Sequence, residues 1–129
     1  MGLAGAAACG GRRATGFPGY LLVADAGGKS VTALDLRSFR IAGKIRLPAA
    51  PSRILVNGKN AFALTPENGS IHTLDVENLT ATASLRLVDD IILARFTPDG
   101  THIAGLGGQS RELVIADPHN RKRVKRLPL

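Results

Sequence analysis

Short runs of alternating apolar and polar residues follow one another along the chain from Tyr20 onward. Ile41, Ile45 and Leu47 alternate with polar or charged neighbours, which is typical of a half-buried strand. The run 91–94 is instead continuously apolar, so we expect a strand buried on both faces there. Gly, Asn, Asp or Pro separates the runs, as in tight turns. The pattern predicts antiparallel strands at 20–25, 30–36, 40–47, 52–57, 60–65, 70–76, 80–87, 91–97, 101–106, 111–117 and 122–127, with almost no α-helix.

The strands belong to a repeat. Arg-Leu pairs begin at Arg46, Arg86 and Arg126, 40 residues apart each time. Asp35, Asp75 and Asp117 recur at intervals of 40 and 42 residues, each closing a β-type run. Four strands in a period of about 40 residues are the signature of a β-propeller blade. The sequence therefore predicts an all-β fold built from four-stranded antiparallel blades, with repeats at about 20–50, 51–90 and 91–129.

The order of these strands resembles the YVTN-type β-propeller repeat. The strand 20–25 (YLLVAD) matches the opening strand of that repeat, and the strand 30–35 (SVTALD) matches its valine-rich strand ending in Asp. Residues 97–100 (TPDG) match its closing Ser-Pro-Asp-Gly turn. The second repeat departs from the pattern at 61–66. The resemblance implies an exported bacterial or archaeal propeller, usually of seven blades, and specifies no activity.

The length predicts an open fragment of about 2.75 blades rather than a closed ring. A closed propeller needs at least four blades, or roughly 160 residues, and this chain has 129. We therefore expect two uncovered blade faces, which would favour self-association or the addition of further blades. The residues expected on these faces are Val31, Ala33 and Leu34 at one end and Leu113, Val114 and Ile115 at the other.

Residues 1–18 read as a tail outside the propeller domain at 19–129. Small residues precede Cys9, the only cysteine, as they do at the end of a bacterial lipoprotein signal. We expect a remnant of such a signal, with Cys9 as the lipidation site. The protein would then be periplasmic or extracellular and anchored to a membrane through its lipid. The alternative is an Ala/Gly tail with an incidental thiol.

The net charge of +7 does not by itself indicate nucleic-acid binding. Most Lys and Arg residues are scattered, and no recognition helix or set of stacking aromatics accompanies them, so we expect no nucleic-acid partner. The one basic cluster lies at 121–126. We favour a charged outer edge strand that prevents sheet-to-sheet aggregation, with attraction to an anionic surface as the alternative.

No constellation of residues predicts catalysis, a metal or a cofactor. Residues 28–30 (GKS) lack the rest of a phosphate-binding loop and precede a strand, so they predict a hairpin turn. His72, His102 and His119 stand at different places in their repeats, and we expect isolated surface histidines. Asp89-Asp90 predicts a turn rather than a calcium or acid/base pair. Asp35, Asp75 and Asp117 predict a structural role, in which each carboxylate accepts backbone N–H bonds from the next turn.

Taken together, these patterns favour a non-catalytic binding or interaction scaffold. The alternative is a fragment of a periplasmic propeller enzyme, of dehydrogenase or lactonase type, whose active-site residues lie in missing blades. Fold alone does not choose between the two functions.

Overall fold

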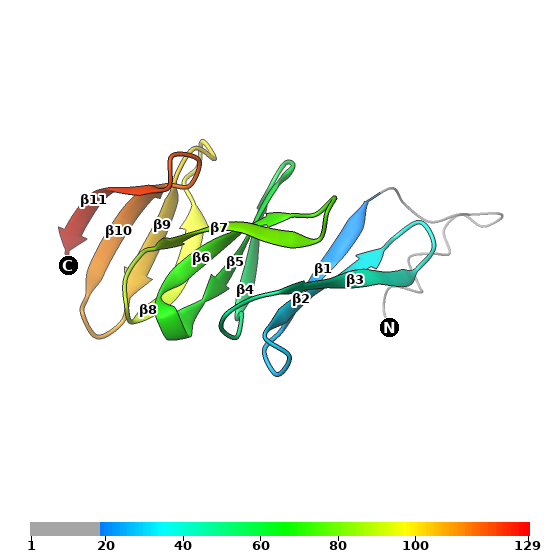
Figure 1. The fold of residues 1–129 in the computed structure, drawn as a ribbon. Helices are drawn as coiled ribbons and strands as arrows, with labels where there is room; N and C mark the ends of the chain where they lie inside the picture. Colours follow the sequence, from blue (N-terminus) through cyan, green and yellow to red (C-terminus); the bar gives the residue numbers. More distant parts are fainter. Residues whose placement is uncertain (1–18) are drawn as a thin grey trace.

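The computed structural model describes residues 19–129, which form three antiparallel β-sheets (Figure 1). The one helical element in this range is the short 3₁₀ turn η2 (Pro66–Asn68). Within residues 19–129 there is consequently no helix of the length and apolarity that a membrane span requires. The all-β prediction is confirmed.

Each sheet corresponds to one repeat, and we call the sheets blades 1, 2 and 3. In each sheet, strands that follow one another in the chain are hydrogen-bonded neighbours. The predicted strands agree with the observed ones to within two residues at each end. The bounds are β1 (Tyr20–Asp25), β2 (Ser30–Asp35) and β3 (Arg40–Arg46) in blade 1; β4 (Arg53–Asn57), β5 (Asn60–Thr65), β6 (Ser70–Asp75) and β7 (Thr80–Arg86) in blade 2; and β8 (Ile91–Phe96), β9 (Ile103–Gly107), β10 (Glu112–Asp117) and β11 (Lys122–Pro128) in blade 3.

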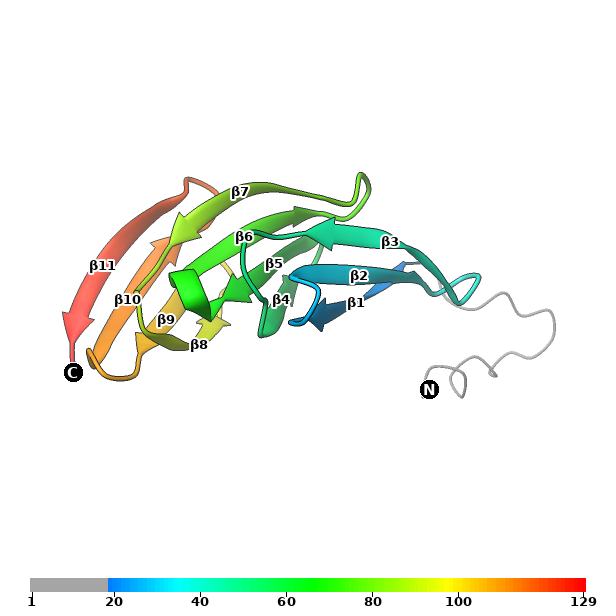
Figure 2. The same ribbon diagram turned by 60° about the horizontal axis from the view of Figure 1, so that its bottom comes forward.

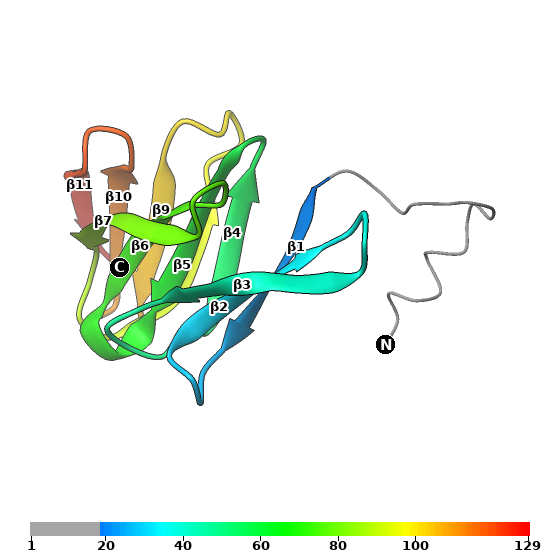
Figure 3. The same cartoon turned by 45° about the vertical axis from the view of Figure 1, so that its right-hand side comes forward.

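The three blades lie side by side in chain order and do not close into a ring (Figures 1 and 3). Figure 2 shows β3, β7 and β11 along one convex side of the molecule, with β4 and β8 on the opposite side. Strands β3, β7 and β11 are therefore the outermost strands of their blades. The predicted open arrangement is confirmed.

A β-bulge recurs in the outermost strand of every blade. The register skips Ala42 in β3, Thr82 in β7 and Val124 in β11, so each of these residues has no direct partner. The extra residue reverses which face the next side chain occupies. Ile41 consequently pairs with Leu34 and is 65% exposed, while Ile45 is fully buried. The predicted continuous alternation along 40–47 was wrong at Ile41 for this reason.

The hydrophobic core lies between the blades. One cluster joins blades 1 and 2 and contains Val31, Ile45, Leu47, Ala61, Ala63 and Leu74. The second joins blades 2 and 3, where Phe62 and Phe96 pack edge to face with ring centroids 5.8 Å apart. Each pair of neighbouring blades is therefore held by apolar burial, the main favourable contribution to folding.

Three residues expected on open blade faces lie instead inside the core. Val31, Ala33 and Val114 are fully buried between blades. Successive side chains of a strand point to opposite faces, so Leu34 and Ile115 turn away from the core that Ala33 and Val114 enter. The prediction placed both rows of side chains on the same face and was wrong for these three residues.

Strand β8 also differs from its prediction. Ile91 and Ala94 are buried against blade 2, but Ile92 is 64% exposed. The register of β8 with β9 skips Ile92, so Ile92 is the extra residue of a bulge and has no direct partner. The apolar run 91–94 is therefore not buried on both faces.

Gly43 and Leu79 make a close contact between blades 1 and 2. Leu79 lies in the turn between β6 and β7 with a left-handed φ of 55°, and its side chain packs against the core between blades 1 and 2. A Cβ at Gly43 would lie 2.7 Å from Leu79 Cδ1. Because glycine has no side chain, position 43 leaves room for the side chain of Leu79.

Candidate functional site

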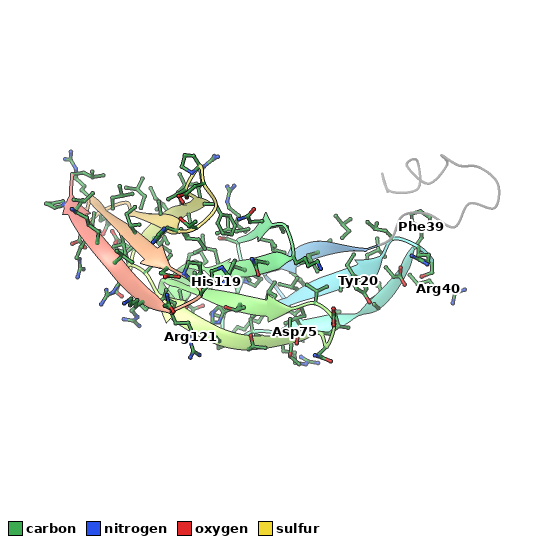
Figure 4. The ribbon with its side chains drawn as sticks, turned by 90° about the horizontal axis from the view of Figure 1, so that it is seen from above. Tyr20, Phe39, Arg40, Asp75, His119 and Arg121 are labelled. Atoms are coloured by element: carbon green, nitrogen blue, oxygen red, sulfur yellow. The ribbon has the colours of Figure 1, made fainter. Side chains whose placement is uncertain are left out.

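The three repeated aspartates stand at the same place in their blades, at the ends of β2, β6 and β10. Figure 4 shows Phe39, Asp75 and His119, one from each of the corresponding turns, spread along the molecule. The structure therefore does not gather these carboxylates into one site.

Each repeated aspartate accepts hydrogen bonds from the turn that follows it. Asp75 Oδ1 accepts the N–H groups of Glu77 and Asn78, both at 3.1 Å, and Asp75 Oδ2 accepts the Asn78 side-chain amide at 2.8 Å. The bond from the Asn78 side chain is the main reason why the pKa of Asp75 is lowered. Asp117 is held in the same way by His119 and Asn120, while Asp35 accepts one bond, from Arg37 N–H. These carboxylates stabilise hairpin turns.

Asp90 also stabilises a turn. It accepts hydrogen bonds from the N–H of Ser110 at 2.6 Å and from its hydroxyl at 2.8 Å. These two bonds, the backbone bond first, lower the pKa of Asp90. Its neighbour Asp89 forms an ion pair with Arg86 at 2.9 Å. Both carboxylates thus have protein partners.

The turn at 28–30 has an acidic group where a phosphate would have to lie. Gly28 N–H donates to Asp25 Oδ1 at 3.1 Å, and Lys29 N–H donates to the Ala26 carbonyl at 3.2 Å. Lys29 adopts a left-handed φ of 50°. The segment is a tight hairpin, and its Gly28 amide is already bound to a carboxylate.

His72 is buried, contrary to the expectation of an isolated surface histidine. It is 4% exposed, and its Nε2 lies 2.9 Å from Thr65 Oγ1. The Thr65 hydroxyl also contacts Asn68 Oδ1 and the Ser70 carbonyl. Burial lowers the pKa of His72, so the neutral ring is favoured. His72 is two residues before the buried Leu74, so both side chains point to the same face of β6. This alternation was present in the sequence and could have indicated that His72 is buried.

Residues 19–129 contain no group of three or more His, Cys, Asp or Glu side chains able to hold a metal ion. Cys9, the predicted lipidation site, lies outside the described residues, as does the predicted tail at 1–18. The candidate site must therefore be sought in the shape of the surface.

A groove with a volume of about 710 Å³ lies between blade 1 and blade 2. Its apolar wall comes from β1, β4 and β6, with Leu22, Ile54 and Leu74 among the lining side chains. Lys59 and Glu77 add charge to the lining. Sequence patterns did not reveal this groove, because it is made by two blades rather than by one motif.

The groove runs beside β1, an edge strand of blade 1. Blade 1 has three strands where blades 2 and 3 have four, and within the described residues β1 pairs only with β2. An edge strand presents unpaired backbone N–H and C=O groups to its surroundings. An extended chain could pair with β1 while its side chains entered the groove.

No protein family matches the sequence, and no curated protein matches it significantly. Solved structures do resemble the fold. Hydrazine synthase of Kuenenia stuttgartiensis aligns with a TM-score of 0.73 at 18% identity, over 83% of this chain and 32% of that one. The dihydro-heme d1 dehydrogenase NirN aligns with a TM-score of 0.73 at 19% identity, over 89% and 28%. These matches are to β-propellers.

The described sheets are β-propeller blades. AztD from Citrobacter koseri, in its apo form, is a third similar structure, with a TM-score of 0.69 and 17% identity over 85% of this chain and 32% of that one. The chain thus spans about a third of the length of the structures it resembles. At such low identity these similarities establish the propeller architecture alone. The function of this chain has to be inferred from its own residues.

Proposed function

We propose that this chain is a non-catalytic interaction scaffold whose outer blade faces bind further propeller blades, supplied by a second copy or by additional sequence. The observation that carries the proposal is the contrast between covered and uncovered blade faces. The core residues between blades, such as Val31 and Val114, are fully buried, whereas the outer face of blade 1 exposes Leu21, Val23 and Ile41.

The register identifies the residues of both uncovered faces. In blade 1, Leu21 pairs with Leu34 and Val23 with Thr32, on the face opposite Val31. In blade 3, Leu113 pairs with Leu106 and Leu127 on the face opposite Val114. Contiguous apolar surface of this kind marks an interaction site in soluble proteins. The apolar outer face of blade 3 could therefore pack against the apolar outer face of blade 1 of a second copy.

Sedimentation velocity of the purified chain over a range of concentrations tests this proposal. We expect oligomers, and we expect Val23→Asp to shift them to smaller species because a carboxylate would be buried in the interface. Val124→Asp is the matched control, since Val124 is exposed in the bulge of an outermost strand. A monomer that melts cooperatively at every concentration would overturn the proposal.

The non-catalytic part of the proposal rests on the hydrogen bonding of the acidic side chains. Asp75, Asp90 and Asp117 are all engaged in turns. Two of the similar structures are named for enzymes, so the alternative of an enzyme fragment has a specific basis. The purified chain should neither reduce a redox dye in a substrate-dependent way nor hydrolyse lactones. Turnover that survives repurification would favour the enzyme fragment.

We also propose export, supported by the small residues before Cys9 and by the resemblance of residues 20–25 to YVTN-type repeats. The gene, expressed from its natural locus with its upstream sequence in a bacterial host, should incorporate labelled palmitate. Cys9→Ala should abolish the label. An unlabelled protein found in the cytoplasmic fraction would reject both export and lipidation.

A further inference from the structure

The outermost strands of the three blades are basic. Figure 2 shows β3, β7 and β11 along the convex side of the molecule. None of the three strands contains an acidic residue. Their cations are Arg40, Lys44 and Arg46 on β3, Arg86 on β7, and Lys122, Arg123, Lys125 and Arg126 on β11.

Strand β11 concentrates this charge. All seven of its residues are exposed. Arg126 forms a two-pronged ion pair with Glu112, in which Nε and Nη2 donate at 2.8 and 3.0 Å. Across residues 19–129 the ion pairs are this one and Arg86–Asp89, so Lys122, Arg123 and Lys125 form none. Three exposed cations within four residues therefore form no ion pair with residues 19–129. The hydrogen bond from Arg126 lowers the pKa of Glu112, and the charge of Arg123 does add to this effect.

Exposed aliphatic side chains lie among these cations. Val124 stands in the bulge of β11, and Leu127 and Leu129 follow in the same exposed segment. The strand has no aromatic residue, which single-stranded nucleic acid would use for stacking. Basic and aliphatic side chains together suit the interface of an anionic membrane, where cations meet headgroups and apolar groups enter the acyl boundary.

We propose that the outer edge of β11 docks on the surface of an anionic lipid membrane. This inference concerns the outer rim of β11, whereas the proposed blade-face association of blade 3 centres on Leu113 and Leu106. Lys122, Arg123 and Lys125 bind headgroup phosphates, and Val124 enters the interface. Each cation near such a surface contributes roughly fivefold in binding.

Co-sedimentation with lipid vesicles tests the proposal. The purified chain should bind vesicles of phosphatidylcholine mixed with phosphatidylglycerol, and not vesicles of phosphatidylcholine alone. Raising the salt concentration should release it. K122Q/R123Q should weaken binding by at least about tenfold. R53Q/K59Q is the matched control, with the same charge change on β4 and its turn, and should retain most of the binding.

The Val124→Ser variant distinguishes a membrane from other polyanions. It should weaken vesicle binding and leave binding to heparin or single-stranded DNA unchanged. Circular dichroism should confirm that every variant keeps its β-structure. Three results would overturn the proposal: no binding to anionic vesicles, equal losses in K122Q/R123Q and R53Q/K59Q, or heparin binding as tight as vesicle binding with no effect of Val124→Ser on vesicles.

Discussion

The side-chain amide of Asn57 donates a hydrogen bond to the carbonyl of Gly100 at 3.1 Å. The two residues belong to corresponding turns of neighbouring blades, β4–β5 in blade 2 and β8–β9 in blade 3. The contact therefore joins the blades at one end, beyond the apolar core that joins them along their length.

Asn57→Ala should lower the free energy of unfolding by about 1 kcal/mol, because it removes this hydrogen bond from an exposed site. Urea denaturation followed by circular dichroism measures the change at fixed protein concentration. Asn60→Ala is the control, since Asn60 is exposed on the same hairpin and its side chain forms no hydrogen bond. Equal losses in the two variants would show that the contact with Gly100 contributes nothing.

Gly69→Ala should destabilise the protein by roughly 2–4 kcal/mol. Gly69 has a left-handed φ of 63°, and an added Cβ would lie 2.3 Å from the carbonyl oxygen of Val88, a backbone atom that cannot rotate away. Gly58 has the same φ and open space around it. Gly58→Ala should therefore cost only about 1 kcal/mol, the penalty of the backbone conformation alone. Denaturant midpoints that coincide would contradict the steric argument.

Stability should decrease as the pH falls below the ordinary His72 pKa of 6.5. Burial lowers the pKa of His72 in the folded protein, so between the folded and unfolded pKa values the unfolded chain binds the proton more readily. The stabilisation is complete above pH 6.5 and is lost as the pH falls through the folded pKa. Thermal melts from pH 8 to pH 5 measure it.

His72→Val provides the comparison for this pH dependence. Val114 occupies the corresponding position in blade 3, three residues before Asp117, and is fully buried there. Valine should therefore fit a strand facing the previous blade. The variant should lose the part of the pH dependence between 5 and 6.5. A profile identical to that of the natural chain would assign the dependence to other groups.

Alanine at the repeated aspartates should lower the melting temperature in proportion to the bonds removed. Asp75 and Asp117 each accept three hydrogen bonds from their turns, whereas Asp35 accepts one. Asp75→Ala and Asp117→Ala should thus have larger effects than Asp35→Ala. Differential scanning calorimetry can rank the three. The opposite order would mean that these bonds do not control the stability of the turns.

The strands could be predicted from sequence because alternation and turn residues are local signals. Features that depend on two strands or two blades could not. Ile41 alternates correctly in the sequence, but a bulge places it on the other face. Ile92 lies in an apolar run, but a bulge in the pairing of β8 with β9 leaves it without a partner and exposed. The burial of His72 could have been inferred from its alternation with Leu74, but its contact with Thr65 on another strand could not.

The candidate groove was hidden for the same reason. Leu22 and Ile54 belong to different blades, and no motif links them in the sequence. The basic cluster at 121–126 was visible in the sequence. That Lys122, Arg123 and Lys125 form no ion pair within residues 19–129 could be seen only in the structure. The sequence shows how many charged residues the chain has. The structure shows which of them already form ion pairs within the protein.

The contact between Gly43 and Leu79 has an evolutionary consequence. A larger residue at 43 requires a smaller one at 79, and a glycine at 79, which its backbone would favour, would leave a void beside Gly43. The two positions should therefore change together in related sequences, across a separation of nearly one repeat. Covariation at that spacing would record how the blades of one chain have adjusted to each other since they duplicated.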